Sequence, residues 1–215
     1  MDYNEEYFYI KPTDLEVYPM LEYARGGGDS MEIFDDIALD TTKTRALCFS
    51  KPIPKDPQLG DHHFLTANAP VISERLKNTL EGLNLKETQF LPTVVQNKEG
   101  EEHIGYYIIH VINLIECMDK DKSEWTPSRR KPGKASDVNK LVLDNEALGK
   151  IALEERLVFA LWENSLNVLY HQSVVEKILE IAPTGLTIYR LSKWDSKTPF
   201  VEEYVDNLQK RMEKS

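Results

Sequence analysis

The hydrophobic pattern of the chain centres on residues 105–125, GYYIIHVINLIECMDKDKSEW, which contain its longest apolar run. From Tyr106 to Ile115, both alternating sets of side chains are largely apolar. A strand with two apolar faces is covered on both faces, so this run predicts the central strand of a sheet. The run is too short to cross a bilayer, which takes about 20 consecutive apolar residues.

Helical spacing of apolar residues appears on either side of this strand. Leucines that follow Ser73, a suitable N-cap, predict an amphipathic helix that ends near Gly82. A similar stripe after Ser173 predicts a second helix, and a third is expected over residues 198–214, where Thr and Pro open the pattern. Residues 15–23 favour a short helix, interrupted by a proline.

Further strands are predicted where β-branched and aromatic residues lie between turn signals. They span residues 6–11, 33–39, 45–49, 88–95, 141–143, 157–162, 166–170 and 186–191. A turn at 97–100 favours an antiparallel hairpin between 88–95 and the central strand. Pro92 indicates an edge position or a bulge in the first of these strands. A second hairpin is expected around residues 163–165.

Together these elements predict an α+β fold with a central, mostly antiparallel sheet and amphipathic helices. There is also a faint internal echo. When the sequence is shifted by about 99 positions, the helix after Ser73 falls on the helix after Ser173, and each is followed by a turn and a strand. This echo raises the possibility of a repeated helix-strand unit.

The length of 215 residues, 41% of them hydrophobic, is enough for one sizeable core or at most two small ones. We therefore expect a single domain over residues 1–215. The N-terminus carries acid where a signal peptide needs Lys or Arg, which favours a cytoplasmic protein. Cys48 and Cys117 have apolar neighbours and are expected to be free thiols.

The net charge of −10 is unevenly distributed. The first 40 residues hold 11 acids against two bases, Lys11 and Arg25, whereas residues 129–134 form a basic stretch. An acidic surface repels nucleic acid and anionic membranes and speeds the encounter with a basic protein. We therefore expect no nucleic-acid or membrane partner.

The candidate metal and phosphate motifs are incomplete. Asp119 to Glu124 has the first spacings of a calcium loop, but the sixth position is not glycine and the twelfth is Arg130, a cation. His62 and His63 lack further ligands nearby and favour a surface loop pair. The glycines at 26–28 lack the ending of a phosphate loop. We therefore expect no metal and no cofactor.

No catalytic constellation stands out in the sequence, which favours a protein that is not an enzyme. His110 lies within the apolar strand, where a lone histidine is typically a hydrogen-bonded core residue. An alternative stays open, in which an enzymatic or small-molecule-binding domain uses a pocket near His110 and Asp119.

Interaction signals are stronger in the acidic N-terminal region, which holds five of the ten tyrosines. Tyrosine is a favoured interface residue, and surrounding acid selects basic partners. The alternative is that some of these tyrosines form one face of a half-buried strand. The predicted contact residues are Glu16, Glu22, Tyr23, Asp29, Glu32, Asp35 and Asp36.

The central strand also resembles a known family. The segments YYIIHVIN, CMD and SEW at 106–125 are similar to the core of family eleven of the bacterial polymorphic-toxin immunity proteins, formerly catalogued as a domain of unknown function. ISERL followed by QFLP at 72–92, LVLD at 141–144 and TGL at 184–186 resemble three further segments of that family. The resemblance covers about residues 64–191 and leaves the acidic region 1–63 and the predicted C-terminal helix outside it.

The resemblance implies a cytoplasmic antidote that binds and neutralises a cognate secreted or contact-delivered toxin domain by occlusion. Many such toxins are basic nucleases, which an acidic protein would meet by charge complementarity. A third possibility is a subunit of a larger assembly that docks through its C-terminal helix, and the oligomeric state stays open. The family-motif residues, expected to be structural, are Tyr107, Asn113, Asp119, Ser123, Trp125 and Gly185.

Overall fold

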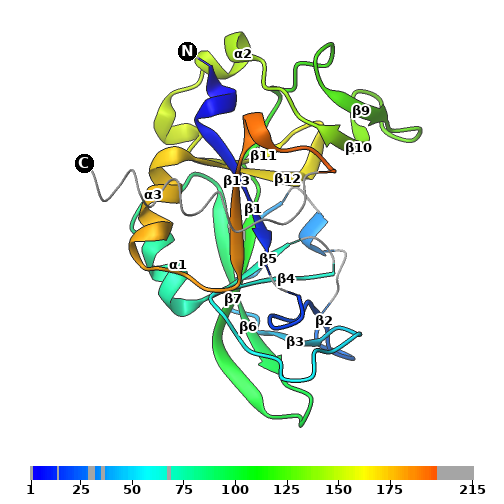
Figure 1. Cartoon of the computed structure of the whole chain (residues 1–215), viewed down its shortest axis with the longest axis vertical. Coiled ribbons are helices and arrows are strands. Elements are labelled where there is room, and N and C mark those ends of the chain that lie inside the picture. The colour runs from blue at the N-terminus through cyan, green and yellow to red at the C-terminus, as the bar shows by residue number, and fades with distance from the viewer. Residues whose placement is uncertain (1, 14, 29–31, 35–36, 67–68, 198–215) are drawn as a thin grey trace. The chain divides into compact units, whose positions relative to one another are not determined.

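The computed structural model describes residues 2–13, 15–28, 32–34, 37–66 and 69–197 (Figure 1). These residues form a mixed fold with mostly antiparallel sheets, which confirms the predicted α+β class. They divide into two compact units. Unit 1 comprises the described residues within 1–10, 113–176 and 187–215, and unit 2 those within 11–112 and 177–186. That the whole chain behaves as a single domain stays a prediction.

Unit 2 contains a six-stranded sheet in which every neighbouring pair is antiparallel except β3 and β6. In spatial order the strands are β2 (Leu21–Tyr23), β3 (Arg45–Phe49), β6 (Thr88–Gln96), β7 (Glu102–Val111), β5 (Pro70–Ser73) and β4 (His62–Phe64). Mostly aliphatic side chains from these strands make its core, including Leu47, Leu91 and Ile108, each 0% exposed.

Strand β7 lies between β6 and β5, so the predicted interior strand is confirmed. The strand is displaced from the predicted run, because it begins four residues earlier, at Glu102, and ends four residues earlier, at Val111. After Ile112 and Asn113, Leu114–Ile115 form β8 in the sheet of unit 1. At the break, the Asn113 side chain donates to the backbone oxygens of Glu155 and Val158 at 2.8 and 3.1 Å. The apolar run is therefore divided between two sheets.

The predicted hairpin of β6 and β7 is confirmed, whereas an edge position for Pro92 is wrong. β6 has neighbours on both sides, but its parallel pairing with β3 begins at Thr93, one residue after the proline. The missing N–H therefore falls where only one ladder is formed. The expected bulge is present as a register shift between Thr93 and Val95.

Two amphipathic helices follow directly on strands. Helix α1 (Glu74–Glu81) has the predicted N-cap, because the Ser73 hydroxyl accepts from the Leu76 backbone N–H. Helix α3 (Gln172–Glu180) begins one residue before Ser173, so the second predicted cap is wrong. The Ser173 hydroxyl instead pairs with Nδ1 of His171 at 2.9 Å.

The connections through α1 and α3 follow the same plan. α1 joins β5 to β6, which both flank β7, and α3 joins β12 to β13, which both flank β1. Each helix therefore crosses over one intervening strand. This shared connectivity accords with the internal echo of the sequence.

Unit 1 contains a five-stranded sheet and a separate two-stranded hairpin (Figure 1). The sheet has the order β13 (Leu186–Arg190), β1 (Tyr7–Pro12), β12 (Asn164–His171), β11 (Val158–Leu161) and β8. The hairpin consists of β9 (Glu124–Pro127) and β10 (Ala135–Lys140), and α2 (Asn145–Gly149) follows it. The pairing of β11 with β12 confirms the second predicted hairpin.

Several weakly patterned segments differ from expectation. Residues 15–23 hold strand β2 and not a helix, and 141–143 contribute one isolated bridge, Leu143 to Met118. A predicted strand at 33–39 is replaced, in its described part, by a short 3₁₀ turn, Glu32–Phe34. Other 3₁₀ turns are Tyr3–Glu5, Leu153–Glu155 and Leu191–Lys193. The predicted helix at 198–214 lies outside the described residues.

Both cysteines are free thiols, as expected. Within the described ranges, no helix has the length and apolar character needed to cross a membrane.

Candidate functional site

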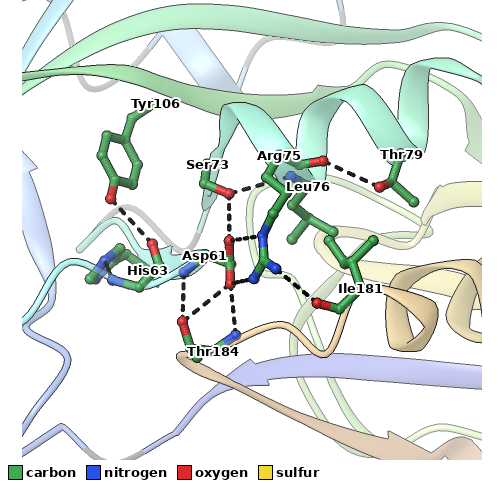
Figure 2. A network of polar contacts seen from close by, with 10 residues as sticks. Asp61, His63, Ser73, Arg75, Leu76, Thr79, Tyr106, Ile181 and Thr184 are labelled. Atoms are coloured by element: carbon green, nitrogen blue, oxygen red, sulfur yellow. Dashed lines mark hydrogen bonds and ion pairs between the residues drawn. The ribbon is translucent and has the colours of Figure 1, made fainter.

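A buried carboxylate in unit 2, Asp61, is the centre of the polar network in Figure 2. It accepts hydrogen bonds from the Ser73 hydroxyl at 2.8 Å, from the Thr184 N–H at 2.9 Å and from the Thr184 hydroxyl at 3.2 Å. The guanidinium of Arg75 donates to both carboxylate oxygens and also to the backbone oxygen of Ile181 at 2.9 Å. We call Asp61, Ser73, Arg75 and Thr184 the Asp61 clasp.

Electrostatics in the clasp favour the ionised form of Asp61. Burial by itself raises the pKa of this carboxyl, but the hydrogen bonds from Arg75, Thr184 and Ser73 outweigh that effect and hold the pKa below its usual 3.8. Both oxygens of the Asp61 carboxylate thus accept hydrogen bonds from donors of the same unit. This arrangement ties β4, the start of α1 and the loop before β13 together, and leaves Asp61 no lone pair suited to proton abstraction.

Gly185 stands beside the clasp and has a structural reason to be glycine. Its φ of +83° lies in the left-handed region, and a Cβ placed there would come within 2.4 Å of the His62 backbone oxygen. Ser73, Arg75 and the Thr184–Gly185 turn all belong to segments that carried the family resemblance. Those sequence motifs therefore meet at one carboxylate that the motif comparison did not single out.

The two adjacent histidines are core residues, and the predicted surface loop pair is wrong. His62 and His63 lie in β4 and are 2% and 1% exposed. The His63 ring bonds to the Pro19 oxygen and to the Gly60 N–H, both at 3.0 Å. Burial lowers the pKa of His62 to about 3 and also lowers the pKa of His63. Pairing of β4 with β5, which local sequence does not reveal, buries both rings.

His110 is a hydrogen-bonded core residue, as expected. It is 4% exposed, and its Nε2 lies 2.9 Å from the Ile37 oxygen within unit 2. Asp119 belongs to unit 1, where its carboxylate accepts from the N–H groups of Asp121 and Lys122 and caps a turn. The walls of the cavity that Asp119 lines do not include His110. The alternative of an enzymatic or small-molecule-binding domain with one pocket near His110 and Asp119 therefore gains no support.

The other family-motif residues of unit 1 bind backbone. The Ser123 hydroxyl donates to the Val142 oxygen and accepts from the Val142 N–H. The indole of Trp125 donates to the Lys120 oxygen at 3.0 Å. In unit 2, Tyr107 packs its ring 5.0 Å from the Lys77 ammonium. These contacts hold loops and strands in place, which is what a structural motif does.

The predicted contact residues have different surroundings. Glu16 is exposed, Tyr23 is half-buried on β2, and Glu22 accepts from the Ser50 hydroxyl at 3.1 Å. The Glu32 carboxylate binds the fully buried Arg45 at 2.6 Å, which engages it within unit 2. Asp29, Asp35 and Asp36 lie outside the described residues. The role of this surface in binding stays a prediction.

Sequence reasoning missed two buried acids. Asp61 precedes a histidine pair that was taken for a loop, and Glu163 was placed in a hairpin turn, yet only 1% of it is exposed. Among the residues that the structure describes, no three His, Cys, Asp or Glu side chains are grouped to hold a metal ion.

Comparison with known proteins identifies a family. A family model described as the immunity protein family (Imm11) matches residues 38–191, more than half of the chain. No curated protein matches. The matched range contains the whole Asp61 clasp, whereas the predicted contact residues at 16–36 precede it.

Proposed function

The chain belongs to the Imm11 immunity protein family, and on this premise we propose that it binds and neutralises a cognate toxin domain by occlusion. The family match over residues 38–191 carries the proposal. The toxin would be secreted or delivered by cell contact, and the protein would meet it in the cytoplasm. The protein would act as a binding inhibitor and not as an enzyme.

The charge of the chain supports a basic partner. With a net charge of −10 and 11 acids in the first 40 residues, the protein attracts a cationic domain over a distance of about one Debye length. Such attraction raises association rates more than it raises affinity. A basic nuclease fits this description, because a nuclease binds the phosphate backbone with Lys and Arg. An acidic inhibitor could cover that same surface.

The contact face that we propose is the acidic region of Glu16, Glu22, Tyr23, Asp29, Glu32, Asp35 and Asp36. Glu16 supports it most directly, since this acid is exposed. Glu32 would act indirectly, because its carboxylate holds Arg45. The region also precedes the family-matched range, so it can differ between members without changing the shared scaffold.

The proposal is tested by purifying the toxin domain encoded beside this gene together with the full chain. We expect the two to elute as one complex in gel filtration. Separate elution at concentrations of about 10 μM would contradict the proposal, because immunity requires much tighter binding than that.

The contact face is tested by charge reversal in Asp35→Lys/Asp36→Lys. We expect at least about tenfold slower association at low salt, and a smaller difference at about 0.5 M salt, where screening is strong. Glu99→Lys/Glu101→Lys is the matched control, because these two exposed acids at the β6–β7 turn change the net charge equally. Equal on-rates for the two double variants would place the contact face elsewhere.

A further inference from the structure

A cavity of about 560 Å³ opens in unit 1, away from the N-terminal acidic region in sequence. Its walls come from the chain after β8, the start of α2 and the turn between β11 and β12. The lining residues are Glu116, Cys117, Met118, Asp119, Lys120, Asp121, Asp144, Ala147 and Glu163. Five of them carry carboxylates and one carries an ammonium group, so the cavity has a marked negative charge.

Glu163 is the residue that distinguishes this cavity from an ordinary acidic surface. It is 1% exposed, and its Oε1 accepts from the Met118 N–H at 3.2 Å. The other oxygen, Oε2, is buried and has no hydrogen-bond partner. A buried carboxylate oxygen without a donor is unfavourable, because it has lost water and gained nothing in return. Burial accordingly raises the pKa of Glu163.

Two of the other acids that line the cavity, Asp144 and Asp119, are engaged in the fold. Asp144 caps α2 by accepting from the Glu146 and Ala147 N–H groups at 2.9 and 3.1 Å. Asp119 accepts from Lys122 Nζ at 2.7 Å. These acids supply negative potential around the cavity without competing for a donor that reaches Glu163.

Lys120, the cation that lines the cavity, acts on the Glu163 carboxyl through its charge but leaves Oε2 without a donor. The Lys120 ammonium lies 3.5 Å from the Glu116 carboxylate, at the exposed rim. The negative field is also felt by the Cys117 thiol, whose pKa is raised by burial first and then by the charges of Glu163 and Asp144. A positive group at the floor of the cavity would therefore be stabilised by several carboxylates at once.

The spacing of the acids argues for an organic cation and against a metal ion. A metal ion needs at least three ligands that converge on one point, and no such group of side chains occurs in the described residues. A guanidinium group is flat, carries five N–H donors and is only weakly hydrated, so it can pair with acceptors that are several ångströms apart.

We propose that this cavity receives an arginine side chain of the toxin domain, whose guanidinium donates to Oε2 of Glu163. The inference rests on the proposed function, of which it specifies one contact. The bound arginine supplies the missing donor to Glu163, and the acids at the rim exclude an acidic side chain. The unpartnered Oε2 is then a recognition atom that gains its donor only in the complex.

The test compares the full chain with Glu163→Gln and with Asp137→Asn, an exposed acid of β10 outside the cavity that undergoes the same chemical change. Affinity for the purified toxin domain is measured by calorimetry. We expect Glu163→Gln to bind at least about 30-fold more weakly, since loss of one partner in a buried charge pair has effects of this size. Asp137→Asn should bind within about twofold of the wild type.

The stability of the free variants separates recognition from folding. Because Glu163 has an unpartnered oxygen, Glu163→Gln should melt at the same temperature as the wild type or higher. Weaker binding combined with unchanged or higher stability supports the proposal. If Glu163→Gln melts lower, the rim variant Glu116→Gln/Asp121→Asn decides, because both side chains are exposed. It should bind about three- to tenfold more weakly.

The possible failures are distinguishable. If the wild type forms no complex with the toxin domain, the proposed function is wrong. If the wild type binds, and either Glu163→Gln at full stability or the rim variant binds equally well, only the arginine pocket is wrong. A third arm titrates the free wild type with Ca²⁺ while the Glu163 carboxyl carbon is followed by NMR. A saturable shift there would also overturn the arginine proposal, in favour of a metal site.

Discussion

Removal of the Asp61 carboxylate is expected to destabilise unit 2 by about 3 kcal/mol. In Asp61→Ala, the Ser73 hydroxyl and both donors of Thr184 lose their shared acceptor. A hydrogen bond to a charged group contributes about 1.5–3 kcal/mol, and bonds to one carboxylate are not additive, so two bonded residues give about 3 kcal/mol. Arg75 adds little to this figure, because its side chain is half-exposed and water can replace Asp61.

The measurement is urea unfolding followed by far-UV circular dichroism, with stability taken from the midpoint and slope. Asp56→Ala is the matched control, because this exposed acid of the same unit should change stability by less than about 0.5 kcal/mol. A loss below about 1 kcal/mol for Asp61→Ala would show that the clasp contributes no more than a surface contact.

The pH dependence of the same pair of proteins gives an independent check. The pKa of folded Asp61 lies below its usual 3.8, so the folded state releases the proton more readily than the unfolded chain. The stabilisation is therefore fully present above about pH 3.8 and is lost as the pH falls through the lowered pKa. The difference between wild type and Asp61→Ala should accordingly be constant near neutral pH and shrink only below about pH 4.

Three further predictions follow from single positions. Gly185→Ala should destabilise the protein by at least about 2 kcal/mol more than Gly100→Ala in thermal unfolding, because both glycines have a φ near +80° but only Gly185 lacks room for a Cβ. Equal losses for the two variants would show that the clash at Gly185 is relieved. His62 has a folded pKa of about 3, below the 6.5 of the unfolded chain, so stability should fall as the pH drops from 6.5 towards 3. His62→Gln should reduce this slope of stability against pH by up to about 1.4 kcal/mol per pH unit in urea titrations. An unchanged slope would show that burial does not lower the pKa of His62. Burial raises the pKa of Glu163, so the folded state binds more protons and stability should decline as the pH rises above 4.5. Glu163→Gln should remove that decline. A parallel decline in both proteins would count against a buried carboxylate whose Oε2 lacks a donor.

The expectation of a single domain can be tested with the native tryptophans. All three lie in unit 1, at 125, 162 and 194, whereas Asp61 lies in unit 2. If the chain unfolds as one cooperative domain, Asp61→Ala should shift the tryptophan fluorescence transition as much as it shifts the circular dichroism transition. A fluorescence midpoint that does not move would show that the two units unfold independently.

Local patterns in the sequence predicted the elements that local contacts determine. The cap at Ser73, the helical leucines after it and the two hairpins depend on residues that are near one another in the chain, so their spacing is informative. The resemblance to the immunity family had the same origin, because the motifs consist of turn and core residues. The family match over residues 38–191 confirms that reading.

Features that depend on distant contacts could not be predicted in this way. The division of the apolar run at Asn113 depends on carbonyl groups more than 40 residues later. The burial of His62 and His63 depends on the pairing of β4 with β5, and the importance of Asp61 depends on Thr184, 123 residues away. Glu163 occupies a turn, where acid is normally exposed. Its burial reflects the Met118 backbone and the cavity walls, which periodicity does not show.

If this protein neutralises a toxin by binding it, its presence should rescue the growth of cells that express the toxin domain. The toxin domain encoded by the adjacent gene is expressed from an inducible promoter, with the full chain supplied on a second plasmid. We expect cells to arrest without the chain and to grow with it, and we expect a toxin domain from an unrelated system not to be neutralised. Continued arrest in the presence of soluble, folded protein would show that the protein does not neutralise this toxin domain.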